Sequence, residues 1–163
     1  MRRSNLALLV VIAEAALALP AAGQDAGLSV DEEAVRSVVQ RLFDGMRAGD
    51  SAAVRSTLDA SARLVSTGAR DGEPVMHSVS IDSFVEAVGQ PHDEVWDERL
   101  SDIEIRIDDA LATMWTQYAF YVGPKLSHCG VDAFQLFKGA DGWKIFQIAD
   151  TRRTEGCEIP EDG

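Results

Sequence analysis

A histidine, an aspartate and a tyrosine stand where two neighbouring strands could bring them together. The segment Leu126 to Phe134, LSHCGVDAF, separates His128 from Asp132 by four residues, and alternate side chains of a strand share a face. Tyr118 lies in the preceding strand-like segment, residues 111–122. Imidazole, carboxyl and phenol groups are the types that transfer protons in enzymes. These three residues are therefore the candidate catalytic group.

The turns beside this segment predict which residues face one another. A three-residue turn at residues 123–125 gives these opposite pairs: Phe120 with His128, Tyr118 with Gly130, and Thr116 with Asp132. Counting around the next turn, residues 139–142, places Gln147 opposite Phe134. A slip of one residue would reverse these faces.

One face of the predicted sheet therefore combines an apolar floor with polar groups. The short strand from Pro74 to Val79 is expected to add a further histidine at the mouth of the same cavity. The candidate ligand-binding residues are His77, Thr116, Phe120, Phe134 and Gln147.

Two arrangements of the candidate catalytic group are chemically reasonable. Asp132 could act as a base while Tyr118 faces an oxyanion in an apolar pocket. Alternatively, His128 could be the base and Asp132 could orient it. An offset of four residues spans about 13 Å along a strand, which disfavours a direct His128–Asp132 bond and favours diagonal contacts with Tyr118. Each residue also has a purely structural interpretation, with its polar atoms satisfied by backbone groups.

The two cysteines, Cys129 and Cys157, belong to no CxxC pair, so a zinc site is not expected. A disulfide between them suits an exported protein, and two free thiols are the alternative. No phosphate loop, dinucleotide fingerprint or nucleophile elbow is present in the sequence. We therefore expect neither a metal nor a cofactor.

The N-terminus has the features of a signal peptide. MRR precedes the apolar stretch LALLVVIAEAALAL, and small residues follow at positions 21–23. The expected organisation is a signal peptide at 1–23, a flexible lead at 24–28, one domain at 29–153 and a C-terminal tail at 154–163. We expect the protein to be exported, to the periplasm or the outside, with no membrane span in the mature chain.

The charge of the chain excludes one class of partner. There are 27 acidic and 15 basic residues among 163, a formal net charge of -12. Nucleic acids require basic surfaces for their phosphates, so nucleic-acid binding is not expected.

Helical patterns come first and strand patterns last. Ser29 and Glu32 form a capping box before an amphipathic helix that Gly49 ends. Asp50 caps a second short helix, and residues 81–88 form a third. Strands are expected at 62–67, 74–79, 95–107, 111–122, 126–138 and 143–152. This order predicts an α+β fold in which a cone-shaped, curved antiparallel sheet wraps around the N-terminal helices.

The other face of the predicted sheet is also largely apolar. It carries Trp115, Tyr121, Phe137 and Ile148, among others. A single sheet with two apolar faces needs a second cover, and another copy of the chain would supply it. We therefore expect a homodimer.

The segment FYVGPKLSHCGVDAFQLFKGADGWKIFQIADTRR, Phe120 to Arg153, resembles the lumazine-binding branch of the nuclear transport factor 2-like (NTF2-like) superfamily. That superfamily also contains ketosteroid isomerase, scytalone dehydratase and SnoaL-like polyketide cyclases. The resemblance covers roughly residues 29–153. It implies a helix-lined cone over a curved sheet, dimeric through the outer face of the sheet. It implies no single activity, because this fold hosts many.

Three functions follow as hypotheses. The first is an exported protein that binds a small apolar or aromatic molecule in the cone. The second is a cofactor-independent isomerase, dehydratase or cyclase that uses Tyr118, His128 and Asp132. The third is a non-catalytic dimeric interaction module whose cone is filled by its own side chains. The sequence leaves open whether the protein is an enzyme.

Overall fold

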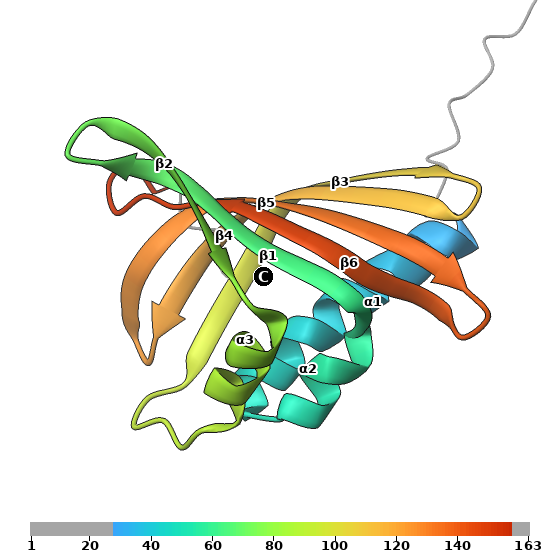
Figure 1. The fold of residues 1–163 in the computed structure, drawn as a ribbon, viewed down its shortest axis with the longest axis horizontal. Helices are drawn as coiled ribbons and strands as arrows, with labels where there is room; N and C mark the ends of the chain where they lie inside the picture. The colour runs from blue at the N-terminus through green and yellow to red at the C-terminus, as the bar shows by residue number, and fades with distance from the viewer. Residues whose placement is uncertain (1–27, 158–163) are drawn as a thin grey trace, which may run out of the picture.

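The computed structural model describes residues 28–157, which form three helices and one curved sheet (Figure 1). The predicted signal peptide, the lead up to residue 27 and the tail from residue 158 lie outside the described residues. Helix α1 spans Val30–Ala48, α2 spans Ser51–Thr57 and α3 spans Ile81–Gly89. Ser29 and Glu32 form the predicted capping box, and Gly49 ends α1 in the left-handed conformation.

Six strands follow or separate these helices. Their bounds are β1 Leu58–Arg70, β2 Glu73–Val79, β3 Trp96–Asp108, β4 Leu111–Val122, β5 Lys125–Gly139 and β6 Gly142–Thr151. They form one sheet in the order β2-β1-β6-β5-β4-β3. The sheet is mixed rather than fully antiparallel as predicted, because β1 pairs with β6 in parallel. The α+β cone fold is otherwise as expected from the sequence.

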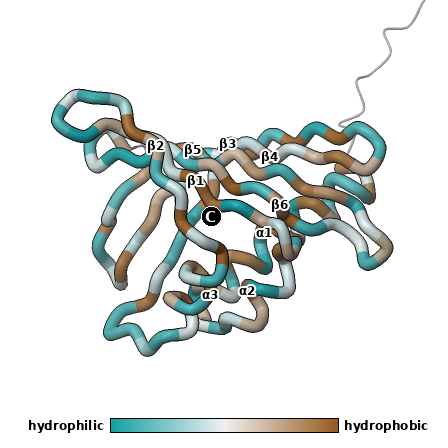
Figure 2. Tube along the Cα trace, in the orientation of Figure 1, coloured by the Kyte–Doolittle hydropathy of each residue, from teal (hydrophilic) through white to brown (hydrophobic). Residues whose placement is uncertain are grey.

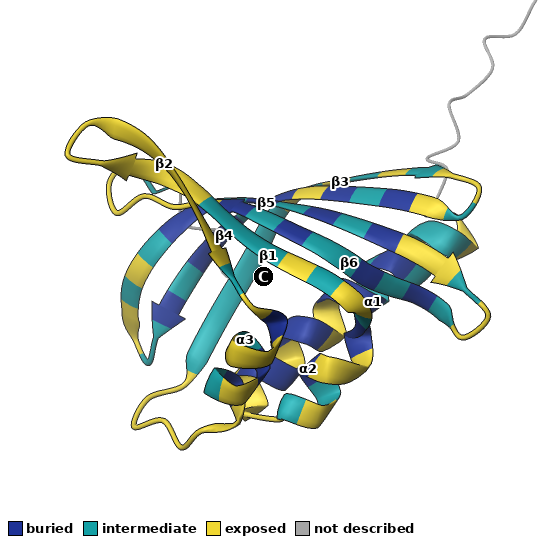
Figure 3. Cartoon of the chain, viewed as in Figure 1, coloured by how far each residue is buried: buried dark blue, intermediate teal, exposed yellow. Residues whose placement is uncertain are grey.

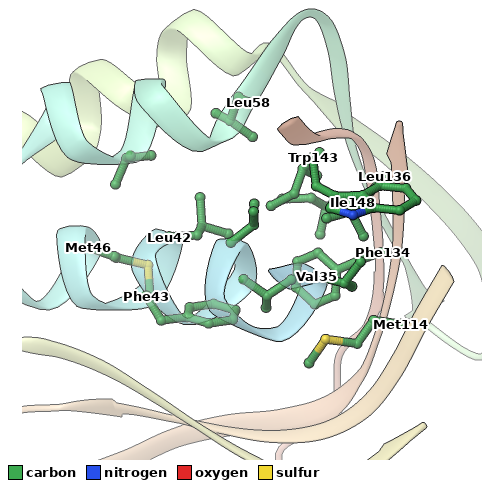
Figure 4. Packing of buried hydrophobic residues seen from close by; sticks show 14 of the residues in the cluster. Val35, Leu42, Phe43, Met46, Leu58, Met114, Phe134, Leu136, Trp143 and Ile148 are labelled. Carbon is green, nitrogen blue, oxygen red and sulfur yellow. The ribbon is translucent and has the colours of Figure 1, made fainter. Parts of the chain in front are cut away.

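The main core lies between α1 and the concave face of the sheet. Helix α1 buries a stripe that includes Val35, Val39 and Leu42, the pattern of a one-sided amphipathic helix. Figure 4 shows this stripe facing Phe134 and Ile148 from the sheet. Burial alternates along β4, β5 and β6 (Figure 3), and hydrophobic residues alternate with polar ones in the same strands (Figure 2). The far end of the β1–β2 hairpin is exposed.

The predicted β4–β5 register is confirmed at the candidate site. Three of its pairs are Phe120 with His128, Tyr118 with Gly130, and Thr116 with Asp132. Nearer the turn the prediction is wrong, because Val122 pairs with Lys125 and the register shifts between Phe120 and Tyr121. The shift absorbs one extra residue of β5, as a β-bulge does.

A second irregularity corrects the predicted β5–β6 pairing. Leu136 pairs with Ile145 as expected, but Phe134 pairs with Ile148 and not with Gln147. A bulge between these pairs reverses the alternation of β6. Ile148 therefore faces the helices, where it was expected on the outer face, and Gln147 faces away from them.

No helix within residues 28–157 is long and apolar enough to span a bilayer.

Candidate functional site

A cavity of about 330 Å³ lies between the concave face of the sheet and helices α1 and α3. Its walls are mainly apolar, and α1 contributes Leu42 and Phe43 while α3 contributes Phe84. The sheet adds further aromatic rings, from Trp96, Phe120 and Phe134. The polar and charged groups of the lining come mostly from the sheet: Glu98, Tyr118, His128, Asp132, Asp150 and Arg152.

Three carboxyl groups from three strands meet at this cavity. Asp132 on β5 and Asp150 on β6 are direct cross-strand partners, and each is less than one tenth exposed. Glu98 on β3 forms a side-chain hydrogen bond with Asp132. Two carboxyl groups can share such a bond only if one of them keeps its proton.

The surroundings of this pair explain why a proton stays. Burial raises the pKa of Asp132 well above its usual range, and the charge of Glu98 raises it further. Burial likewise raises the pKa of Glu98 to about 7, with a further contribution from the charge of Asp150. Part of the Glu98 surface faces the cavity, but the group lies deep within the protein. The pair therefore holds at least one proton near neutral pH.

Two oxygens of these carboxyl groups are buried without a hydrogen-bond donor. Asp132 Oδ2 and Asp150 Oδ1 have no hydrogen-bond partner among residues 28–157, apart from the proton that Asp132 shares with Glu98. Buried polar atoms are rarely left in this state. Both residues line the cavity, so a small rotation of either side chain would bring these oxygens to a bound molecule.

The hydroxyl of Tyr118 is already engaged by the protein. It donates to the carbonyl oxygen of Thr151 at 2.9 Å and lies 3.3 Å from Asp150 Oδ2. Burial and the neighbouring carboxyl charges raise its pKa. Tyr118 therefore holds the end of β6 in place and is not free to stabilise an oxyanion.

The imidazole of His128 lies between two aromatic rings at the cavity wall. Its centroid is 4.9 Å from that of Phe120 and 5.8 Å from that of Tyr118, and its Nδ1 is 3.0 Å from Ser127 Oγ. Burial, with the charge of Arg152, lowers the pKa of His128 to about 4. The ring is neutral at physiological pH. No hydrogen bond joins it to Asp132 among the described residues, so the arrangement with Asp132 orienting His128 is not formed.

The predicted ligand-binding residues separate into two groups. Phe120 and Phe134 line the cavity. Thr116 is fully buried and donates to the carbonyl oxygen of Ser101 at 2.7 Å, so it braces β4 against β3. His77 is exposed on β2 and outside the lining. Gln147 lies on the opposite face of β6, within 3.5 Å of Arg63.

The sequence analysis missed Glu98, Asp150 and Arg152. Glu98 lies in a partly alternating strand, and the register that places it opposite Phe120 follows from the β3–β4 hairpin. That hairpin contains a bulge between Ser101 and Glu104, and Glu98 lies beyond it, so counting from the turn without the bulge would place Glu98 opposite Tyr121 instead. Asp150 and Arg152 lie beyond the β6 bulge, which reverses the face that simple alternation from the turn predicts for them.

Cys129 and Cys157 form a disulfide, with their Cα atoms 5.7 Å apart. This is the first of the two alternatives that the sequence left open. Within the part of the chain that is described, no cluster of three or more His, Cys, Asp or Glu side chains has the arrangement of a metal site.

Solved structures with the same fold come from several bacteria. An NTF2-like protein with a cystatin-like fold from Novosphingobium aromaticivorans has a TM-score of 0.62 at 10% identity, covering 78% of this chain and 84% of its own. A protein described as a putative dehydratase of the NTF2-like family from Streptomyces avermitilis has a TM-score of 0.56 at 17% identity, with coverages of 75% and 95%. A protein described as a putative ketosteroid isomerase from Shewanella frigidimarina has a TM-score of 0.53 at 19% identity, with coverages of 72% and 94%.

At these identities the similarity shows the fold alone. No curated protein matches the chain. The family model described as "Putative lumazine-binding" matches residues 30–148, which span α1 to the inward-facing Ile148 of β6. The chain therefore belongs to the family described as "Putative lumazine-binding", and it shares the fold of the NTF2-like structures above.

Proposed function

We propose that this protein binds a small, mainly apolar or aromatic molecule in the cavity between the helices and the sheet. The observation that carries the proposal is a cavity of about 330 Å³ with apolar walls and convergent carboxyl groups. Ligand sites typically combine such walls with a few polar groups that fix orientation. The family description names lumazine, a small heteroaromatic molecule, which is consistent with a ligand of this kind. The open cavity disfavours the hypothesis of a cone filled by side chains.

A filled-cavity variant tests the proposal. Native mass spectrometry of the purified protein should detect a co-purified small molecule. Ala87 lines the cavity from α3, whereas its neighbour Glu86 is exposed. We expect Ala87→Trp to remove the bound mass and Glu86→Trp to retain it. Equal retention by two folded variants would place the ligand elsewhere, and absence of any bound mass from the parent protein would contradict a tightly held ligand.

Acid–base catalysis without a cofactor is the second candidate. It is favoured by the Glu98–Asp132 pair, because a carboxyl group whose pKa is near 7 can both give and accept a proton at neutral pH. His128 and Tyr118 contribute less than the sequence predicted, since a pKa of about 4 makes the former a weak base and the latter is engaged by Thr151. A dehydratase, isomerase or cyclase of this kind would lose turnover but keep ligand binding in Glu98→Gln.

We further propose that the protein is exported and dimeric. The signal-peptide pattern supports export, and the disulfide suits an oxidising compartment. On the outer face of the sheet, Leu111, Trp115 and Phe137 are each about half exposed. Large exposed apolar side chains on one face favour an interface, and a second copy of the chain would cover them.

A further inference from the structure

We propose that the ligand is an organic cation, a protonated amine on an apolar or aromatic body, whose charged nitrogen lies against Glu98, Asp132 and Asp150. This inference rests on the proposed function and specifies the chemical class of the ligand. It is carried by the acceptor atoms, the charge and the aromatic walls of the cavity.

The acceptors of the site lack donors. Asp150 Oδ1 is buried with no hydrogen-bond partner within residues 28–157, and Asp132 Oδ2 has none beyond the proton that Asp132 and Glu98 share. Asp150 is 7% exposed and Asp132 is 3% exposed, so bulk water does not readily replace the missing donors. An ammonium group supplies three donors and no acceptor, which is what this set of oxygens requires. A carboxylate or phosphate would add further acceptors to a site that already has too many.

The charge of the lining favours the same class. Three carboxyl groups face the cavity, and Arg152 is the one positively charged residue in the described lining. Its side chain is 56% exposed, and its Nη2 contacts only the other oxygen of Asp150, Oδ2, at 3.4 Å. Asp150 Oδ1 is therefore not bonded by Arg152. Because Arg152 is largely solvated, its charge only partly offsets the negative charge of the carboxyl groups in the lining.

Aromatic rings surround the path to these carboxyl groups. Phe120 is in edge contact with Trp96, with ring centroids 6.2 Å apart, and in tilted contact with His128 at 4.9 Å. Aromatic faces attract cations through their quadrupole. An apolar ligand body gains from the same rings through burial. Together the aromatic walls and the three carboxyl groups match an aromatic amine better than a neutral or anionic analogue.

Binding of a cation should also release protons. The titratable and charged groups that face the site are Glu98 on β3, Tyr118 on β4, His128 and Asp132 on β5, and Asp150 and Arg152 at the end of β6. Among them, the Glu98–Asp132 pair holds a proton near neutral pH. A bound ammonium stabilises the ionised form of the pair, and the displaced proton passes to solvent. With Glu98 half protonated near pH 7, we expect release of roughly half a proton per ligand.

Three probes that share one ring system test this inference on the full protein. They are 2-naphthylmethylamine, 2-naphthalenemethanol and 2-naphthoate, which are cationic, neutral and anionic at pH 7. We expect isothermal titration calorimetry to show at least tenfold tighter binding of the amine than of the other two. Titrations in two buffers with different ionisation enthalpies should show proton release for the amine alone.

Charge-removing variants complete the test. Glu98→Gln and Asp150→Asn should each weaken amine binding about tenfold while leaving binding of the alcohol nearly unchanged, and Glu98→Gln should reduce proton release. The matched control Glu86→Gln, an exposed position on α3 outside the cavity, should change neither. Preference for the alcohol or the carboxylate overturns the inference but leaves the proposed cavity site intact. Failure of all three probes to bind contradicts both.

Discussion

The carboxyl groups of Glu98, Asp132 and Asp150 meet although they come from three different strands. Sequence predicted only Asp132, because its strand carries an obvious alternation and a recognisable turn on each side. Glu98 lies close to three other acidic residues, at positions 93, 94 and 97, a pattern typical of a solvated surface. Local composition could not reveal that one of these side chains faces inward. Only the pairing of β3 with β4 places it opposite Phe120.

The protonation of Glu98 should appear in the pH dependence of stability. Its pKa in the folded protein is about 7, compared with an ordinary value of 4.5. Between these values the folded state binds more protons than the unfolded state, so the free energy of unfolding falls as the pH rises through this window. Relative to the parent protein, Glu98→Gln should gain on the order of 2 kcal/mol between pH 5 and pH 8. Urea unfolding at both pH values measures this difference.

The variant is compared with the parent at each pH because His128 acts in the opposite direction. Its folded-state pKa of about 4 lies below the ordinary 6.5, so its contribution to stability increases as the pH rises from 4 to 6.5. The two effects partly cancel in the parent protein. Glu86→Gln should show a difference from the parent that does not vary with pH. A similarly constant difference for Glu98→Gln would contradict the raised pKa.

At the scale of elements, every helix and strand was predicted, and most ends agree within a few residues. The reason is physical: capping residues, left-handed glycines and alternation all act locally. The exceptions are β1, which is longer at both ends than residues 62–67, and the two strand irregularities near Tyr121 and Phe134. A bulge depends on how neighbouring strands twist against each other, so no local pattern marks it. The misplacement of Gln147 and Ile148 follows from one such bulge.

Gly130 shows how tightly β5 and the end of β6 approach. A Cβ atom at this position would collide with the carbonyl oxygen of Thr151 and would lie 2.8 Å from Tyr118 Cε1. We expect Gly130→Ala to destabilise the protein by about 3 kcal/mol, at the upper end of overpacking effects. It should also displace the carbonyl that accepts from the Tyr118 hydroxyl. Chemical denaturation measures the loss.

A second strand glycine provides the control. A Cβ atom on Gly68 in β1 would have its nearest neighbour, the carbonyl oxygen of Arg152, at 3.7 Å, an ordinary contact distance. Gly68→Ala should therefore cost less than about 1 kcal/mol. Equal stability of the two variants would show that β6 relaxes away from β5 without cost.

At the scale of the whole molecule, the sheet separates two apolar surfaces. The concave surface is covered by the helices and encloses the cavity, whereas the convex surface leaves Trp115 and Phe137 about half exposed. The resemblance to the NTF2-like superfamily anticipated the cone fold, and the family match agrees with it. Dimerisation remains a prediction.

We expect the parent protein to have a dimer mass in size-exclusion chromatography with light scattering. Trp115→Glu should shift it to the monomer, because a charge in the centre of an apolar interface is costly to bury. Met76→Glu provides the control, since Met76 is also strongly exposed but lies on β2, at the other end of the sheet. A monomeric parent, or dissociation by both changes, would contradict an interface on the outer face.

The disulfide lies behind the carboxyl groups and not beside them. Cys129 follows His128 in β5, and its bond to Cys157 closes over a backbone bridge in which Cys129 and Arg153 exchange two hydrogen bonds of 2.9 Å. The segment fixed in this way includes Arg152. It begins directly after Thr151, whose carbonyl oxygen accepts the hydrogen bond from Tyr118. If the chain folded in a compartment where thiols stay reduced, only these two backbone hydrogen bonds would hold the segment against β5. The affinity for the proposed ligand would then depend on the redox state of the compartment in which the protein folded.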